Sequence, residues 1–374
     1  MLECMEYLNN MGFSLSSLTS LLKADAVASP RLGVLGVDIG TSTIKVVQLK
    51  DVKGVPTLEK YGEVQLGPYE GVDLSMGTHL STQKAIEALN DILKESEVTS
   101  KDAHFAVPYS ACFITPISVP TVDQEQIGAM IPVEARKFIP ISLSKVTLNW
   151  FPLFAHIEEQ KTDVLVSAIS NDVLNRLNTI MTGAGLSAVT NEIEVFSSMR
   201  SILSPEDNVV VVIDFGASST RMCIVKSGIV TKTHSVLLSG IEITKALAGS
   251  LTVGFEDAEI MKREYGMEGK KDDERVRKVI TQAIERGVRE LHTVVKRYET
   301  EDTSTVEKIF ITGGGASLHG LHAHMRDVFS KPIHLAHPFS KVAYPAFLED
   351  TLKEIGPDFA VAIGIALRAF ESRK

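Results

Sequence analysis

The segment Asp38-Ile39-Gly40-Thr41-Ser42-Thr43-Ile44-Lys45 returns in the second half of the chain as Asp214-Phe215-Gly216-Ala217-Ser218-Ser219-Thr220-Arg221. Each copy lies between two apolar runs that read as β-strands, so each is expected to form the turn of a hairpin. A hairpin that occurs once in each half of a chain predicts two similar lobes that face each other.

The two hairpins carry groups that suit a bound phosphate. Glycine lets backbone N–H groups approach a phosphate closely, and serine and threonine hydroxyls add donors. Asp38 and Asp214 repel phosphate, but they can hold Mg²⁺ through water molecules, and the metal bridges to phosphate oxygens. Lys45 and Arg221 can point back at the same charge. The phosphate-binding residues predicted are Gly40, Thr41, Ser42, Thr43 and Lys45, and in the second copy Gly216, Ala217, Ser218 and Ser219.

A third glycine-rich segment follows another apolar strand. Gly313, Gly314 and Gly315 come directly after Ile309 to Thr312, and a helix is expected from Leu318 to Phe329. Backbone without side chains, placed between a strand and a helix, can lie against a flat or anionic ligand. A simple turn is the alternative for this segment taken alone.

Composition restricts the class of partner. The 374 residues carry a net charge of −9, which disfavours nucleic acid or an anionic membrane as a general ligand. The three cysteines, Cys4, Cys112 and Cys223, are scattered, as is usual in a reducing cytoplasm. No apolar run reaches the length of about 18 residues that a transmembrane helix needs. Residues 1–31 read as a flexible leader.

The motifs together resemble those of the actin, sugar-kinase and heat-shock-chaperone superfamily. The two hairpins are similar to its phosphate-1 and phosphate-2 motifs, and Ile311 to Gly315 to its adenosine motif. By the same resemblance Glu259, Lys262 and Arg263 would contact adenosine of ATP. Asn191 to Arg200 and Phe359 to Arg368 resemble its two connecting helices. The implied fold is α/β and actin-like, with two duplicated ribonuclease-H-like lobes.

The segment from Phe113 to Ser170 reads as strand, helix, strand and strand, and it narrows the resemblance. An insert of this type in the first lobe is similar to that of the division protein FtsA and of PilM-type proteins of type IV pilus assembly. The domains expected are 1–31 leader, 32–112 with 171–200 first lobe, 113–170 insert, and 201–374 second lobe, in which 355–374 returns to the first lobe as a connecting helix.

The PilM-type resemblance implies a cytoplasmic ATP-binding scaffold at the inner face of the inner membrane. Its partner would be the N-terminal cytoplasmic tail of a PilN-like membrane protein, with other pilus components and self-association left open. An FtsA-like assembly ATPase and a small-molecule kinase of the same superfamily are the alternatives.

Hydrolysis of ATP is a separate question. The second hairpin has Ala217 and Ser218 where actin and the chaperones place glycine or an acidic residue, which predicts weak or absent hydrolysis. A polar group from the first connecting helix would have to orient the attacking water. Glu194 is the candidate catalytic residue and Glu192 is the alternative, although an ordinary solvated or capping carboxylate is the favoured interpretation of each.

The insert is also where a partner peptide is expected. The strand Phe113 to Val119 is apolar at alternate positions, and Pro116 lacks a backbone donor, which suits an edge strand. A peptide is expected to lie beside it, in a groove between insert and first lobe, with the helix from Asp123 to Phe138 as one wall. Ile117 is expected to contact this peptide.

Overall fold

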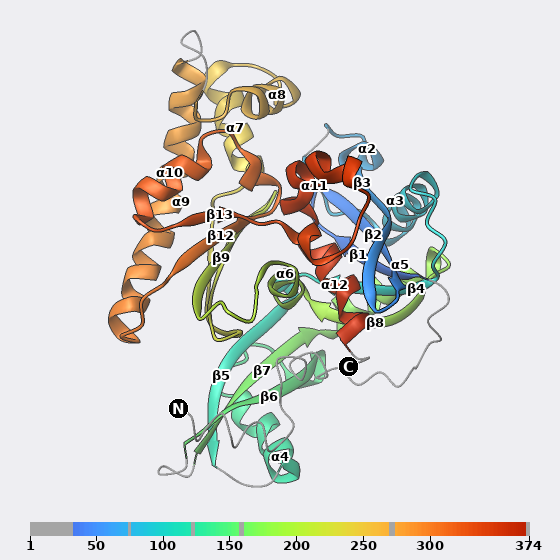
Figure 1. Ribbon diagram of the computed structural model, residues 1–374, viewed down its shortest axis with the longest axis vertical. Coiled ribbons are helices and arrows are strands. Elements are labelled where there is room, and N and C mark those ends of the chain that lie inside the picture. The colour runs from blue at the N-terminus through green and yellow to red at the C-terminus, as the bar shows by residue number, and fades with distance from the viewer. Residues whose placement is uncertain (1–32, 74–75, 121–123, 157–160, 269–273, 372–374) are drawn as a thin grey trace.

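The computed structural model describes residues 33–73, 76–120, 124–156, 161–268 and 274–371. Their strands form two five-stranded sheets and one three-stranded sheet (Figure 1). The strands of the first sheet are β1 (Val34–Ile39), β2 (Thr43–Val52), β3 (Val55–Gln65), β4 (Asp102–Val107) and β8 (Ser187–Ile193). Those of the second are β9 (Val209–Phe215), β10 (Thr220–Lys226), β11 (Ile229–Val236), β12 (Lys308–Thr312) and β13 (Ile333–Leu335).

The two large sheets have the same topology. The strand order is β3-β2-β1-β4-β8 in the first and β11-β10-β9-β12-β13 in the second. The strands β1, β2 and β3 pair antiparallel with one another in sequence, and so do β9, β10 and β11. The next strand along the chain, β4 or β12, pairs in parallel with β1 or β9. The two repeated hairpins occupy equivalent places, between β1 and β2 and between β9 and β10. The internal repeat in the sequence is therefore a repeat of a whole sheet.

The outer face of each sheet is covered by helices with one apolar side. On the first sheet these are α3 (Thr82–Glu95) and α5 (Asn171–Gly183), with the short α2 (Gly67–Glu70) nearby. On the second they are α7 (Gly240–Leu251), α8 (Phe255–Tyr265), α9 (Glu274–Glu301) and α10 (Leu321–Phe329). The long α9 turns a stripe of buried apolar residues to the sheet: Val276, Ile280, Ile284, Val288, Leu291 and Val295.

Two further helices lie between the sheets. The helix α12 (Ala360–Glu371) covers the inner face of the first sheet, and α6 (Glu194–Ile202) covers the inner face of the second. Residues 360 to 368 of α12 are all buried, as an almost entirely apolar helix requires. The helices α6 and α12 pack on each other in the centre of the molecule, and the short α11 (Glu349–Ile355) lies above them in Figure 1. The helices α6 and α12 are the two connections between the lobes.

The third sheet belongs to the insert, which extends from the first lobe at the bottom of Figure 1. It has the order β5 (Cys112–Pro120), β7 (Lys161–Ser170), β6 (Val146–His156), and α4 (Gln124–Ala135) packs on one face. Among the described strands β5 pairs only with β7, so it is an edge strand. Ile117 is 5% exposed and lies in the core under α4, so the expected contact of this residue with a peptide is wrong.

Several elements differ from the sequence-based expectation. The first connecting helix begins at Glu194, because Asn191 to Ile193 continue β8 alongside β4. From Gly314 to Ser317 the chain forms a 3₁₀ turn, and α10 starts only at Leu321, because Gly320 is left-handed at φ 82°. The helix α4 ends at Ala135 and not at Phe138. The leader 1–31 and Asp123, where the helix of the insert is expected to begin, lie outside the described residues.

Candidate functional site

The two hairpin turns are built alike. The Gly40 N–H donates to the carbonyl of Thr43 over 2.9 Å, and the Gly216 N–H donates to that of Ser219 over 3.1 Å. Each aspartate lies directly across the hairpin from a cation: Asp38 pairs in register with Lys45, and Asp214 with Arg221. Both turns therefore present one acidic and one basic side chain beside a glycine turn.

The carboxylates of the two hairpins come together between the lobes. Burial raises the pKa of Asp38 to about 6, against the attraction of Lys45, and the charge of Asp214 raises it further. Burial also raises the pKa of Asp214, while Arg221 and Lys45 oppose the shift. Asp38 and Asp214 are partly buried carboxylates with raised pKa values, and a nearby divalent cation would stabilise their charged forms. The two side chains are chemically compatible with Mg²⁺ held through water, which stays a prediction.

Lys45 has acidic neighbours that the sequence did not reveal. Its Nζ donates to Thr43 Oγ1 over 2.7 Å and lies 3.8 Å from Glu63 Oε1 and 3.9 Å from Asp358 Oδ1. Burial acts to lower the pKa of Lys45, but Asp358 and Glu63 outweigh it and the pKa is raised. Glu63 lies across the β2–β3 pair from Lys45, which a correct register would have shown. Asp358 lies just before α12, and no pattern in the sequence predicted that it would contact Lys45.

The three glycines pack against the second hairpin. The Gly313 N–H donates to the carbonyl of Pro357 over 3.0 Å, and a β-carbon at Gly313 would touch the Asp214 carboxylate and lie 2.8 Å from the Phe215 carbonyl oxygen. A β-carbon at Gly314 would lie 2.6 Å from Asp358 Oδ1. The structure therefore brings all three motifs to one place. It also shows that a larger residue at position 314 first meets Asp358, so it does not test ligand approach alone.

The residues expected at adenosine are joined to the second hairpin through α7. Lys262 Nζ donates to Glu259 Oε2 over 2.6 Å and to the Gly240 carbonyl over 3.0 Å at the start of α7. The Gly240 N–H in turn donates to the Gly216 carbonyl over 3.2 Å. Burial lowers the pKa of Lys262. Burial acts to raise the pKa of Glu259, but the charge of Lys262 and the hydrogen bonds outweigh it, and the pKa of Glu259 is lowered. These two side chains thus face each other within the second lobe.

Arg263 has a different environment from Lys262. Its Nε donates to Glu259 Oε1 over 2.8 Å, and its side chain is 64% exposed. Burial raises the pKa of Glu63, and the charges of Lys45, Asp358 and Arg263 also act on it. Because Glu63 belongs to the first lobe, the charge of Arg263 acts across the space between the lobes.

Glu194 is held by partners on both sides. Its Oε1 accepts from the Tyr109 N–H over 2.7 Å and from Arg221 Nη1. Burial raises the pKa of Glu194 to about 7, although Arg221 lowers it, and the negative charges of Asp38 and Asp214 raise it further. The side chain is 14% exposed, so it is neither a solvated nor a simple capping carboxylate.

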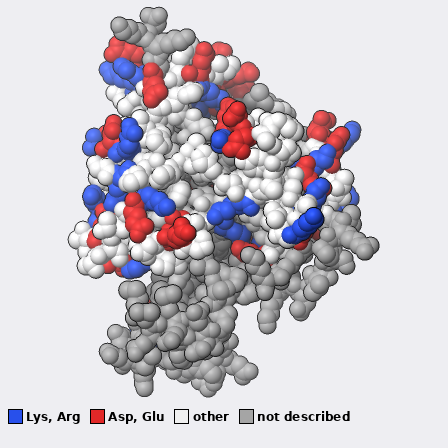
Figure 2. Space-filling model, viewed as in Figure 1, with Lys and Arg blue, Asp and Glu red and all other residues white. Residues whose placement is uncertain are grey.

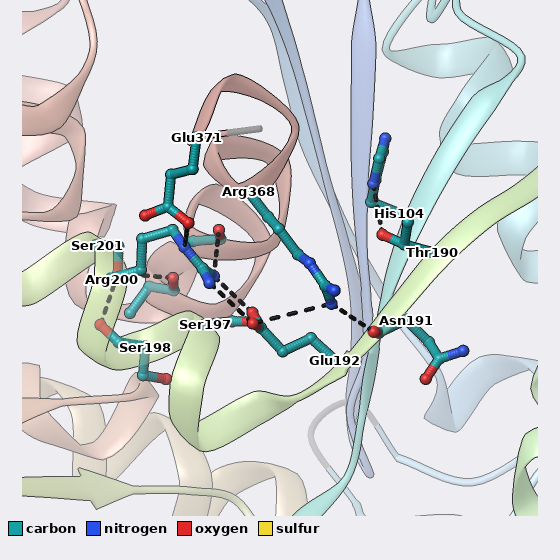
Figure 3. A network of polar contacts seen from close by, with 12 residues as sticks. His104, Thr190, Asn191, Glu192, Ser197, Ser198, Arg200, Ser201, Arg368 and Glu371 are labelled. Carbon is teal, nitrogen blue, oxygen red and sulfur yellow. Dashed lines mark hydrogen bonds and ion pairs between the residues drawn. The ribbon is translucent and has the colours of Figure 1, made fainter. Parts of the chain in front are cut away.

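Glu192 belongs to the crossing of the two connecting helices (Figure 3). Its Oε2 accepts from Arg200 Nη1 over 2.5 Å and its Oε1 from Arg200 Nη2 over 2.8 Å. Burial opposes the shift, but Arg200 and then Arg368 hold the pKa of Glu192 below its usual range. Arg200 also donates to Glu371 on α12 over 2.9 Å. Through Arg200 this carboxylate links the two connecting helices.

The face shown in Figure 2 has no extended field of one sign among its described residues. On the face in Figure 2, basic and acidic side chains alternate over the second lobe, and much of the centre is uncharged. Among the described residues no helix combines the length and apolarity needed to cross a membrane.

Comparison with known proteins identifies the family. The family of the type IV pilus assembly protein PilM matches residues 36–370. The chain is similar to the solved PilM-PilN type IV pilus biogenesis complex, with 26% identity and a TM-score of 0.78 over 91% of this chain and 99% of that chain.

Two more distant structures share the fold. Ethanolamine utilization protein EutJ from Carboxydothermus hydrogenoformans is 18% identical, with a TM-score of 0.56 over 95% of this chain and 99% of that chain. MreB 5 of Spiroplasma citri bound to AMPPNP is 13% identical, with a TM-score of 0.51 over 90% and 95%. The predicted actin-like, two-lobed α/β fold is confirmed. With the family match extending from the first strand to the last helix, the chain belongs to the PilM family of type IV pilus assembly proteins.

Proposed function

We propose that this protein is an ATP-binding scaffold of type IV pilus assembly. In this proposal it works at the cytoplasmic face of the inner membrane and binds the N-terminal tail of a PilN-type membrane protein. The observation that carries the nucleotide part is the meeting of Asp38 and Asp214 between two matched glycine turns. Family membership and the likeness to a PilM-PilN complex support the pilus part.

The nucleotide would be held by backbone and charge. The N–H groups and hydroxyls of the two turns, from Gly40 to Thr43 and from Gly216 to Ser219, would surround the phosphates. Mg²⁺ would be held by Asp38 and Asp214 through water and would neutralise the phosphate oxygens. The raised pKa of Asp38, about 6, supports this, since a dication would stabilise a carboxylate whose charge burial, and to a lesser degree Asp214, disfavours. The base would lie near Gly313 to Gly315 and the α8 residues Glu259, Lys262 and Arg263.

The same geometry favours a scaffold over an ATPase. A catalytic carboxylate must be free to orient water, but Glu194 already accepts from the Tyr109 N–H at 2.7 Å and from Arg221. Glu192 is paired with Arg200 at the helix crossing. We therefore infer that bound ATP orders the two lobes and that turnover is slow.

The partner tail would bind beside the insert. β5 offers a free backbone edge among the described strands, and its residues Cys112 and Ile114 pack toward the first lobe. The insert also exposes apolar side chains: Val133 is 65% exposed, and Phe138 and Ile141 are each 49% exposed. An extended peptide can pair with a strand edge and place alternate side chains in apolar pockets.

Calorimetric titration of the protein with Mg-ATP tests the nucleotide site. Asp38→Ala and Asp214→Ala should each weaken binding at least about tenfold and remove its dependence on Mg²⁺, because the water molecules around the metal lose a carboxylate acceptor. Asp91→Ala, an exposed carboxylate on α3, is the control and should bind as the unmodified protein does. Unchanged Mg-ATP affinity in both site variants would refute the assignment.

Titration with a synthetic PilN-type tail peptide tests the partner site. Val133→Asp should weaken peptide binding at least about tenfold, because it puts a charge on an apolar contact. Val52→Asp is the matched control, since Val52 is also an exposed valine, 41% exposed, at the tip of the β2–β3 hairpin. Equal peptide affinity of both variants and the unmodified protein would place the tail elsewhere.

A further inference from the structure

The root of the insert is tied to the second lobe by one residue. Tyr109 lies in the 3₁₀ turn Tyr109–Ala111, between β4 of the first lobe and β5 of the insert. Its backbone N–H donates to Glu194 Oε1 over 2.7 Å. Its phenolic oxygen lies 2.7 Å from Thr233 Oγ1 on β11 of the second lobe. Any movement of the insert root relative to the second lobe must therefore disturb Tyr109.

The other side of Glu194 leads directly to the second hairpin. Arg221 Nη1 contacts the same oxygen, Oε1, that accepts from Tyr109. Arg221 lies across the hairpin from Asp214 in the register of β9 and β10. A continuous series of contacts thus runs from Asp214 through Arg221 and Glu194 to the first residue of the insert root.

One cation in this series has several acidic neighbours. The positive charge of Arg221 acts on Asp38, Asp214 and Glu194, each of which has a raised pKa owing mainly to burial. Phosphate oxygens placed at the hairpins would compete with Glu194 for this guanidinium, since arginine binds phosphate in the same bidentate manner as carboxylate. When Arg221 turns to phosphate, Glu194 loses the charge that keeps it ionised and becomes a weaker acceptor for the Tyr109 N–H.

We propose that Glu194 is a positioning residue that couples the phosphate site to the insert. Bound nucleotide draws Arg221 from Glu194 and loosens Tyr109 at the insert root. A tail peptide that displaces the insert root releases Arg221 for phosphate in turn. The two ligands therefore strengthen each other's binding, and by linkage the factor is the same in both directions. This inference rests on the proposed function, because it needs both ligands.

The test is a pair of calorimetric titrations on the full chain. The affinity for a synthetic PilN-type tail peptide is measured without nucleotide and with saturating Mg-ATP. The expected ratio of the two affinities is at least about fivefold, the lower end of ordinary allosteric coupling. In Glu194→Gln the ratio should fall toward one while both ligands still bind, because the amide can still accept from Tyr109 but no longer competes for Arg221.

Two further variants separate positioning from mere structure. Tyr109→Phe removes only the hydroxyl contact with Thr233 and should reduce the ratio, which keeps the test valid if Glu194→Gln does not fold. Asp207→Asn is the control: Asp207 pairs with Lys308 at 2.6 Å in the second lobe, away from Arg221. It should leave the ratio unchanged, because a general loss of stability does not alter the coupling between two ligands.

The outcomes distinguish the two proposals. If either ligand fails to bind the unmodified protein, the proposed function is wrong and the coupling with it. If both bind but the ratio is one, only the coupling is overturned. If the ratio is fivefold or more and persists unchanged in both Glu194→Gln and Tyr109→Phe, the coupling does not pass through these residues and the assignment is refuted.

Discussion

Replacing Gly364 by alanine probes the contact between the two connecting helices. Gly364 of α12 lies against Ser197 of α6, and a β-carbon added at Gly364 would lie 3.0 Å from Ser197 Cα. It would come closer still to the carbonyl carbon and oxygen of Ser197. Carbon atoms in good contact are about 3.5–4.0 Å apart. Because all three obstructing atoms are backbone, no side-chain rotation relieves the overlap, and α12 must move as a unit.

The net effect is the difference of two terms. Alanine is favoured over glycine within a helix by about 1 kcal/mol. Forcing extra volume into a packed interior costs about 1–3 kcal/mol, and a backbone obstruction belongs at or above the upper end. Movement of α12 would also strain the hydrogen bond from Arg200 Nη1 to the Gly364 carbonyl, 3.2 Å long. The expected loss in the free energy of unfolding is therefore about 2 kcal/mol.

Urea unfolding measures this loss directly, and α7 supplies a matched control. Gly249 also lies within a helix, but a β-carbon there would meet no atom within 4 Å. Gly249→Ala should therefore stabilise the protein by about 0.5–1 kcal/mol, through helix propensity alone. If Gly364→Ala proves as stable as Gly249→Ala, the helices are not in tight contact and the reasoning fails.

Three other predictions concern the site. Because the pKa of Asp38 is raised from 3.8 to about 6, the folded chain binds a proton there at a higher pH than the unfolded chain does, so apo stability should rise by about 1 kcal/mol as the pH falls from 8 to 5. Urea midpoints should show this slope flattened in Asp38→Asn, and an equal slope would contradict it. Lys262→Met should destabilise by about 3 kcal/mol in urea, because it leaves Glu259 buried without its main cation, whereas Lys262→Arg should cost less; equal stability of both variants would argue against the pair. A double-mutant cycle of Gly314→Ala and Asp358→Ala should show at least about 1 kcal/mol of coupling, since the new β-carbon meets Asp358, and additive losses would exclude that contact.

The sequence predicted the parts of the site whose chemistry is local. A hairpin such as Asp38 to Lys45 places its acid, turn glycine and base within eight consecutive residues, so one segment shows all three. The repeat at Asp214 then implied the duplicated sheet. The insert was predicted for the same reason, since its strands and helix follow one another along the chain and pair mainly among themselves.

The remaining site residues depend on contacts between distant segments. Asp358 reaches Lys45 only because α12 returns to cover the first sheet, and the pair is separated by most of the chain. The sequence placed Glu192 in a helix. Parallel pairing of β8 with β4 keeps this residue on a strand, from which it contacts Arg200. The strand β11 was missed, because much of its length is polar; its place is set by pairing with β10 and not by its own pattern.

The two halves of the molecule are alike in their sheets but unlike in the partners of their hairpin cations. Lys45 of the first hairpin is directed to Glu63 and Asp358, on the side where adenosine is proposed to lie. Arg221 of the second hairpin is directed to Glu194, which begins a connecting helix and holds the root of the insert. Duplication alone would have given both cations equivalent partners. The insert is joined to the first lobe, yet through Tyr109 and Glu194 it contacts the cation of the second lobe, so a ligand between the hairpins acts on it from both sides.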